Sequence, residues 1–160
     1  MKSLIRILAL TLILLTLAGC SIGTKQFACR DLTMTVPAGM KDVSGQSDFA
    51  AYTFTLDSTS LAIFALQERY DEYPVLEEYN LQSYTELVIQ ANNLDCVPES
   101  RSGENYYYFT YTYNNAGVEY KYLTATYQSG EGFWMVQISA PLERYDEATY
   151  FQYLDSVEFQ

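Results

Sequence analysis

The stretch YYYFTYTYNNAGVEYKYLTATYQSGEGFWMVQI, residues 106–138, decides the fold. On both sides of Asn114–Gly117, a typical hairpin turn sequence, the side chains are rich in Tyr and Thr and fall on two faces with a period of two. A second turn signal, Ser129–Gly132, precedes the apolar run that completes the stretch. Because strands joined by short turns pair antiparallel, residues 106–138 predict a meander of neighbouring strands.

The first half of the chain also carries strand patterns. Apolar and polar residues alternate over Leu32–Val36, which ends at Pro37, and again over Ala51–Leu56. Residues Leu61–Leu66 form a continuous apolar run, which predicts a strand covered on both faces. These segments therefore add strands to the meander.

Two segments have helical periodicity instead. After Pro74, apolar residues recur every three or four positions, which predicts an amphipathic helix from about 75 to 92. Beyond Pro141, Ala148, Phe151, Leu154 and Val157 again share one helical face. Strands interrupted by helices in this order predict an α+β fold, an antiparallel sheet flanked by helices.

Composition limits the function classes. The chain has 160 residues, which suits one domain, and 9 Lys and Arg against 20 Asp and Glu give a formal charge of −11. Such a charge repels phosphate backbones, so we expect no nucleic-acid partner. The chain contains no His, which removes the commonest general base and metal ligand.

The first twenty residues are typical of a secretory leader. Lys2 and Arg6 precede an apolar run over residues 7–18, and as a helix this run would reach about 18 Å, too short for a bilayer core of about 30 Å. Leu17-Ala18-Gly19-Cys20 resembles the lipobox of bacterial lipoproteins. The resemblance implies a diacylglyceryl group on Cys20 and cleavage just before it.

The chain therefore divides into a signal peptide over 1–19, a lipidated tether over 20–26 and a domain over 27–160. Two acyl chains suffice for stable anchoring, so we expect the domain at the extracytoplasmic face of a bacterial membrane. The alternative is a Cys that happens to end a signal sequence.

Cys29 and Cys96 are the cysteines left after such cleavage. Outside the cytoplasm, two cysteines can form a disulfide. They can equally remain free and pack as small hydrophobic side chains. Two Cys without His are too few ligands for zinc, so we predict no metal site.

The chain contains 16 Tyr, and the Tyr-rich strands suggest a binding platform. Tyr combines an apolar ring with a polar tip and is common in recognition surfaces. The alternative is that these residues are good strand formers with their hydroxyls at the sheet margin. The candidate platform residues, taken from adjacent predicted strands, are Tyr106, Tyr108, Tyr120, Tyr122 and Tyr127.

No sequence motif indicates catalysis or a cofactor. The chain has no Gly-x-Ser-x-Gly elbow, phosphate-binding glycine loop or calcium-loop spacing. Acidic pairs such as Asp71-Glu72, Glu77-Glu78 and Asp146-Glu147 could bind calcium or simply form a solvated surface. We therefore expect a non-enzymatic protein without a cofactor.

The domain resembles small extracytoplasmic lipoproteins of the PsbP-like superfamily. The resemblance is carried by the segments Leu32–Met40 (LTMTVPAGM) and Phe151–Phe159 (FQYLDSVEF), together with the mid-chain helix and the meander. It implies an α/β/α sandwich around an antiparallel sheet. Because this fold serves many functions, the resemblance by itself predicts no particular function. We expect a lipid-anchored accessory protein that engages another envelope component, or alternatively a carbohydrate-binding module that uses the Tyr-rich sheet.

Overall fold

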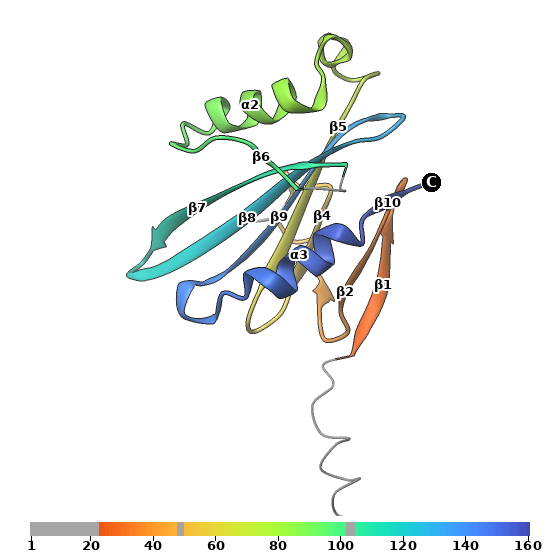
Figure 1. The fold of residues 1–160 in the computed structure, drawn as a ribbon. Helices are drawn as coiled ribbons and strands as arrows, with labels where there is room; N and C mark the ends of the chain where they lie inside the picture. Colours follow the sequence, from red (N-terminus) through yellow and green to blue (C-terminus); the bar gives the residue numbers. More distant parts are fainter. Residues whose placement is uncertain (1–22, 48–49, 102–104) are drawn as a thin grey trace, which may run out of the picture.

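The computed structural model describes residues 23–47, 50–101 and 105–160, drawn in Figure 1. The described elements are, in chain order, β1 (Thr24–Cys29), β2 (Leu32–Pro37), β3 (Lys41–Asp42), β4 (Phe54–Asp57), β5 (Ala62–Arg69), the 3-10 helix η2 (Pro74–Glu78), α2 (Leu81–Ala91), β6 (Glu99–Ser100), β7 (Tyr107–Asn115), β8 (Val118–Gln128), β9 (Gly132–Pro141), the 3-10 helix η3 (Leu142–Arg144), α3 (Glu147–Asp155) and β10 (Glu158–Phe159).

These strands form two antiparallel sheets. The larger sheet has the order β3-β4-β5-β9-β8-β7-β6, and the smaller has the order β1-β2-β10. The prediction of an α+β fold with an antiparallel sheet is confirmed. The longest pairings join β7 to β8 and β8 to β9, so the predicted meander forms one side of the larger sheet.

The β7–β8 hairpin turns as its sequence predicts. Asn115 pairs with Val118, and the two residues between them, Ala116 and Gly117, have φ angles of 51° and 88°. Two successive positive φ values are typical of a type I′ turn, whose twist matches that of the strands it joins. The turn fixes the register of every pair of residues further along the hairpin.

The helices α2 and α3 lie on opposite sides of the larger sheet (Figure 1). On one side, Tyr84 of α2 stacks on Phe133 of β9 with ring centroids 4.1 Å apart and an interplanar angle of 7°. On the other side, α3 contributes Phe151 and Leu154 to a core around Trp134. Each face of the sheet therefore has its own apolar core.

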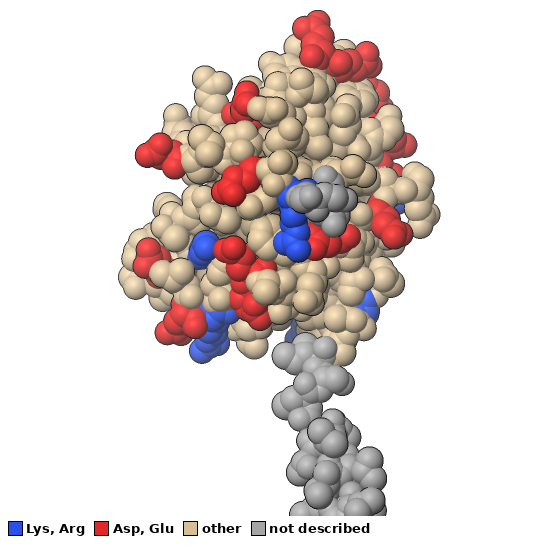
Figure 2. Space-filling view, in the orientation of Figure 1, with Lys and Arg blue, Asp and Glu red and all other residues tan. Residues whose placement is uncertain are grey.

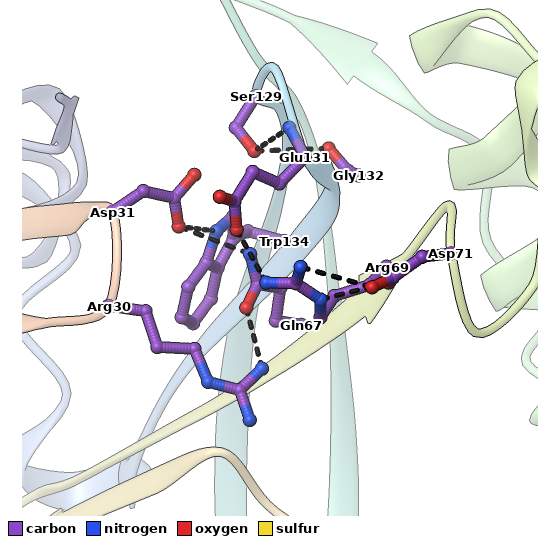
Figure 3. Close-up of polar contacts among 9 residues, drawn as sticks. All are labelled: Arg30, Asp31, Gln67, Arg69, Asp71, Ser129, Glu131, Gly132 and Trp134. Atoms are coloured by element: carbon purple, nitrogen blue, oxygen red, sulfur yellow. Dashed lines mark hydrogen bonds and ion pairs between the residues drawn. The ribbon is translucent and has the colours of Figure 1, made fainter.

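The smaller sheet completes the core on the α3 side. Leu32, Met34 and Val36 of β2 are fully buried, because their side chains alternate toward that core. The turn between β1 and β2 is held by Asp31, whose Oδ1 accepts hydrogen bonds from Trp134 Nε1 and Gln67 Nε2 (Figure 3). The two sheets are thus joined by both apolar packing and a polar contact.

The predicted helix over 75–92 is wrong in one respect, because the segment forms η2 and then α2 with a break between them. Asn80 begins α2 as its N-cap: its side chain accepts a hydrogen bond from Ser83 N, and the Ser83 side chain accepts one from Asn80 N. A capping box of this kind starts a new helix rather than continuing the preceding one.

Two smaller expectations also need correction. The tether predicted over 20–26 is too long, because residues from Thr24 onward pair with β2 as strand β1. The prediction that Leu61–Leu66 is covered on both faces is wrong, because Phe64 and Leu66 are only partly buried.

In the described part of the chain, no helix has the length and apolar character needed to cross a membrane.

Candidate functional site

The candidate site is an aromatic surface on the α2 side of the larger sheet. Cross-strand pairing places Tyr111 opposite Tyr122 and Tyr113 opposite Tyr120 on β7 and β8. The rings of Tyr111 and Tyr122 stack with centroids 4.8 Å apart and an interplanar angle of 3°. Together with Tyr52, these four residues form what we call the tyrosine face.

Tyr52 lies in the segment before β4 and joins the same face of the sheet next to β5. Its ring lies 5.0 Å from the ring of Phe64 on β5. A small cavity of about 90 Å³ is lined by Tyr52 and Tyr111 together with residues of the α2 end, including Val88 and Asn92. The tyrosine face therefore begins where the cover provided by α2 ends.

This limit to the cover explains why the tyrosine face is open. Under α2, Phe109 and Phe133 are almost fully buried. Further along β7 from Phe109, Tyr111 is partly buried, and near the hairpin tip Tyr113 is 60% exposed. Val118, at the start of β8, adds a further exposed apolar side chain near the hairpin tip.

The part of the tyrosine face on β7 and β8 lies among uncharged side chains, whereas Tyr52 lines a pocket that also contains Arg30, Glu68 and Glu72. Alternation along β7, β8 and β9 puts uncharged residues at every position on this side between the hairpin tip and the middle of α2. These positions are Phe109, Tyr111, Tyr113, Asn115, Val118, Tyr120, Tyr122, Thr124, Thr126, Met135, Gln137, Ser139 and Pro141.

Elsewhere, the molecule is strongly acidic. Figure 2 shows Asp and Glu side chains scattered over the visible surface and gathered at its top, whereas Lys and Arg are fewer. The top of that view corresponds to the η2 region, which carries Glu77 and Glu78. An uncharged aromatic surface on a chain of formal charge −11 is therefore a local exception.

Burial disfavours ionisation of two phenols of the tyrosine face, Tyr111 and Tyr122. It raises the pKa of Tyr111 to about 12, although a hydrogen bond of 2.9 Å from Gln137 Nε2 to the Tyr111 hydroxyl acts in the opposite direction. Burial also raises the pKa of Tyr122, with further contributions from neighbouring tyrosines that include Tyr52. The ionised forms of these two phenols are disfavoured, so they provide neutral hydrogen-bonding groups.

The structure brings together only two of the five residues predicted to form a platform. Tyr120 and Tyr122 belong to the tyrosine face. Tyr106 and Tyr127 are 3% and 4% exposed on the α3 side, and Tyr108 packs edge-on against Phe151 there. The predicted five-residue platform is therefore wrong, because alternation along the strands sends its members to opposite faces.

The tyrosine face also contains residues that the sequence interpretation missed. Tyr111 and Tyr113 could have been found by counting back from the type I′ turn, which fixes their partners as Tyr122 and Tyr120. No sequence signal indicates Tyr52, because its position depends on how the segment before β4 folds over the sheet.

The candidate disulfide is not present. Cys29 and Cys96 are both free. Cys29 packs against the core on the α3 side, and Cys96 packs against the core under α2. The larger sheet separates the two thiols, so the alternative of two free cysteines that pack as small hydrophobic groups describes them.

The remaining site predictions are untested. Cys20, the predicted lipidation site, lies outside the described residues. Across residues 23–47, 50–101 and 105–160, no group of three or more Cys, Asp or Glu side chains is arranged to hold a metal ion. The expectation that the protein is non-enzymatic and has no cofactor stays a prediction.

Comparison with known proteins relates the fold to solved structures. No protein-family model and no curated protein matches the chain. A crystal structure from Bacteroides thetaiotaomicron VPI-5482 is similar with a TM-score of 0.57 and 10% identity, covering 85% of this chain and 48% of that one. This chain thus spans about half the length of that protein, and at this identity the likeness concerns the fold alone.

A second similar structure is the solution structure of cyanobacterial PsbP (CyanoP) from Synechocystis sp. PCC 6803. It has a TM-score of 0.49 and 10% identity, and the match covers 89% of this chain and 95% of that one.

Proposed function

We propose that this protein is a non-enzymatic, PsbP-like binding protein held by a lipid on Cys20 at the extracytoplasmic face of a bacterial membrane. Its tyrosine face binds another protein of the cell envelope. The observation that carries the proposal is the open, uncharged aromatic surface formed by Tyr52, Tyr111, Tyr113, Tyr120 and Tyr122 on an otherwise acidic molecule.

The chemistry of this surface suits a protein partner. Tyr is enriched in the buried centres of protein interfaces, where charged residues are depleted. Tyr113 and Val118, which are 60% and 46% exposed, supply apolar area at the hairpin tip. Burying this surface against a partner removes apolar area from water without desolvating any charge.

The proposed anchor limits where the partner is found. Gly23 O accepts a hydrogen bond from Ala38 N, so the chain is fixed to the domain three residues after Cys20. Three extended residues reach about 11 Å, so a lipid on Cys20 keeps the domain close to the bilayer surface. The partner is therefore an envelope protein at that same surface.

Recovery of the partner from solubilised membranes tests this proposal. We expect the wild-type protein to recover one reproducible envelope protein, and the double variant Tyr113→Ser/Tyr120→Ser to lose it. Tyr73→Ser is the matched control, because Tyr73 is 51% exposed and lies outside the tyrosine face. Equal recovery by the double variant, or no reproducible partner, would contradict the proposal.

A carbohydrate-binding module is the second candidate, and the uncharged character of the tyrosine face favours it for neutral glycans. Tyrosine rings combine apolar surface with a hydroxyl group, so exposed ones such as Tyr113 offer both apolar contact and hydrogen bonds to a sugar. However, Tyr111 and Tyr122 stack on each other, so each has one ring face already covered. Saturable binding of a neutral oligosaccharide that Tyr122→Ser abolishes would select this candidate, and an array of glycans without signal would exclude it.

A further inference from the structure

The border of the larger sheet at β7 is only partly paired. The short strand β6 pairs with Tyr107 and Tyr108, and the described residues provide no neighbouring strand on that side for the rest of β7. Figure 1 shows this remainder at the outer side of the sheet, beyond the end of β6. The segment Phe109–Asn115 therefore presents an open strand edge.

The hairpin turn determines which backbone groups face this edge. With a two-residue turn, Asn115 and Val118 form a hydrogen-bonded pair, and such pairs then alternate along the two strands. Thr110, Thr112 and Asn114 therefore direct their N–H and C=O groups away from β8. In the described part of the chain, none of these backbone groups has a hydrogen-bond partner.

The open edge also lacks the features that usually protect a strand edge. Lysine, proline and bulges are common devices against unwanted strand pairing. Phe109–Asn115 (FTYTYNN) has no charged residue and no proline, and it pairs with β8 residue for residue without a bulge. In contrast, the other terminal strands of the two described sheets are two residues long, as β3, β6 and β10 are, or contain a lysine, as β1 does at Lys25. The edge of β7 is thus suited to receive a further strand.

The charges around the open edge indicate which kind of strand fits. Glu99, paired with Tyr108, and Glu119, paired with Asn114, are exposed acidic residues at the two ends of the edge and on the same side of the sheet. They favour an occupant with a basic residue near its end. A second copy of this chain would instead bring the same acids and a formal charge of −11. A strand of a different protein therefore suits this edge better.

We propose that the envelope partner contributes an extended segment that pairs with Thr110–Asn114 as an added strand of the larger sheet. This inference rests on the proposed function and names the contact that the partner makes. The backbone of the segment bonds to the outward N–H and C=O groups of β7, as in other cases of strand addition. Every second side chain of the segment is uncharged and lies beside Tyr111 and Tyr113, so that the segment continues the tyrosine face, and a Lys or Arg near its end lies close to Glu119.

Recovery of the partner from solubilised membranes tests the backbone contact. Thr112→Pro removes the outward N–H of an exposed residue, and because β8 does not use this N–H, the hairpin is preserved. Recovery should fall by about tenfold or more, because a carbonyl group of the partner loses its donor. Thr112→Ala keeps the N–H and is the matched control, which should stay within about twofold of the wild type.

The outcomes of this experiment separate the two proposals. Equal recovery by Thr112→Pro and Thr112→Ala would overturn strand addition and leave the proposed function standing. A wild-type protein that recovers no reproducible partner would contradict the proposed function and this inference together.

Hydrogen exchange of the recovered wild-type complex is a second readout, and it decides the question even if Thr112→Pro does not fold. The amides of Thr110, Thr112 and Asn114 should exchange more slowly in the complex than in the free protein, by about tenfold or more, because they become part of a strand ladder. A partner that docks on the tyrosine side chains alone would leave these three amides unchanged, and that result would overturn the inference.

Two further measurements test the identity of the occupant. Glu119→Lys should lower recovery by about threefold, whereas Glu78→Lys, exposed on η2, should not change it. Equal recovery by these two variants would contradict the basic residue assigned to the partner. Sedimentation of the purified wild-type protein should show a monomer, and a dimer that Thr112→Pro dissociates would assign the edge to a second copy and overturn the proposal.

Discussion

The indole Nε1 of Trp134 donates a hydrogen bond of 3.0 Å to Asp31 Oδ1 and so ties the β1–β2 turn to the central strand β9 (Figure 3). The same carboxylate oxygen accepts a second hydrogen bond of 3.1 Å from Gln67 Nε2 on β5. Trp134 is fully buried and Gln67 nearly so. Two buried donors therefore depend on a single side chain of the β1–β2 turn.

Asp31→Ala should lower the free energy of unfolding by about 2 kcal/mol or more, because it leaves the buried donors of Trp134 and Gln67 without this acceptor. Urea denaturation followed by far-ultraviolet circular dichroism measures the change. Asp71→Ala is the control, because Asp71 forms an exposed ion pair with Arg69 and should cost less than about 1 kcal/mol. Equal effects of the two substitutions would show that the contact with Trp134 contributes nothing particular.

Gly132 should not tolerate a side chain. A Cβ atom there would lie 2.2 Å from Glu68 O, in the paired strand, and φ at this position is +154°. Because backbone must shift to relieve such a contact, Gly132→Ala should lower the free energy of unfolding by about 3 kcal/mol or more, or prevent folding. Gly130→Ala, in the same turn but with open space around its Cβ, should change it by less than about 1 kcal/mol. Similar stability of the two variants would contradict this packing.

The hairpin turn can be improved. Ala116 has a φ of 51°, a conformation that costs an alanine about 1 kcal/mol, whereas Asn adopts it more readily and Asn-Gly is the preferred type I′ pair. Ala116→Asn should therefore raise the free energy of unfolding by about 0.5–1 kcal/mol in a thermal melt. Ala91→Asn, at the end of α2, should lower it instead, by roughly 0.5 kcal/mol. A loss of stability in Ala116→Asn would show that the turn is not type I′ in solution.

The tyrosine face predicts a loss of stability at alkaline pH. Burial raises the pKa of Tyr111 to about 12 in the folded protein, above the value of about 10 for an unfolded chain. The folded state thus holds this proton more tightly, and the associated stability is fully present below pH 10 and is lost as the pH rises toward 12. Because the ring is partly exposed, we expect a loss of about 1–2 kcal/mol from this group.

Unfolding by urea at pH values between 9 and 12 measures that loss. The stability of Tyr111→Phe should fall less steeply with pH than that of the wild type, because the titrating group is gone, whatever the cost of the substitution at pH 7. Parallel curves for the two proteins would show that Tyr111 does not titrate as described.

Much of the fold follows from local patterns. The period of two over residues 106–138 and the turn at Asn114–Gly117 predict the meander and its hairpin, which the structure confirms. The break before α2 could also have been predicted, because Asn80 and Ser83 have the spacing of a capping box. These features depend on residues within a few positions of one another.

The rest depends on contacts between distant segments. The side of the sheet on which Cys29 or Cys96 lies, and the contact of Tyr52 with Phe64, are set by the path of the chain over the sheet. The apolar run at Phe64 and Leu66 suggested full burial, but α2 does not extend over the whole face. The candidate site was therefore only half predictable: its strand residues follow from register, but its openness does not.

Site-specific photocrosslinking in intact cells tests the tyrosine face most directly. A photoreactive benzoylphenylalanine at position 113 should give a single adduct with an identified envelope protein, and Tyr120→Ser in the same chain should abolish it. The same photoreactive residue at position 73, where Tyr73 is 51% exposed against 60% for Tyr113 and lies outside the tyrosine face, should give no such adduct. An adduct that forms equally from both positions, or none from position 113, would contradict the binding role of this surface.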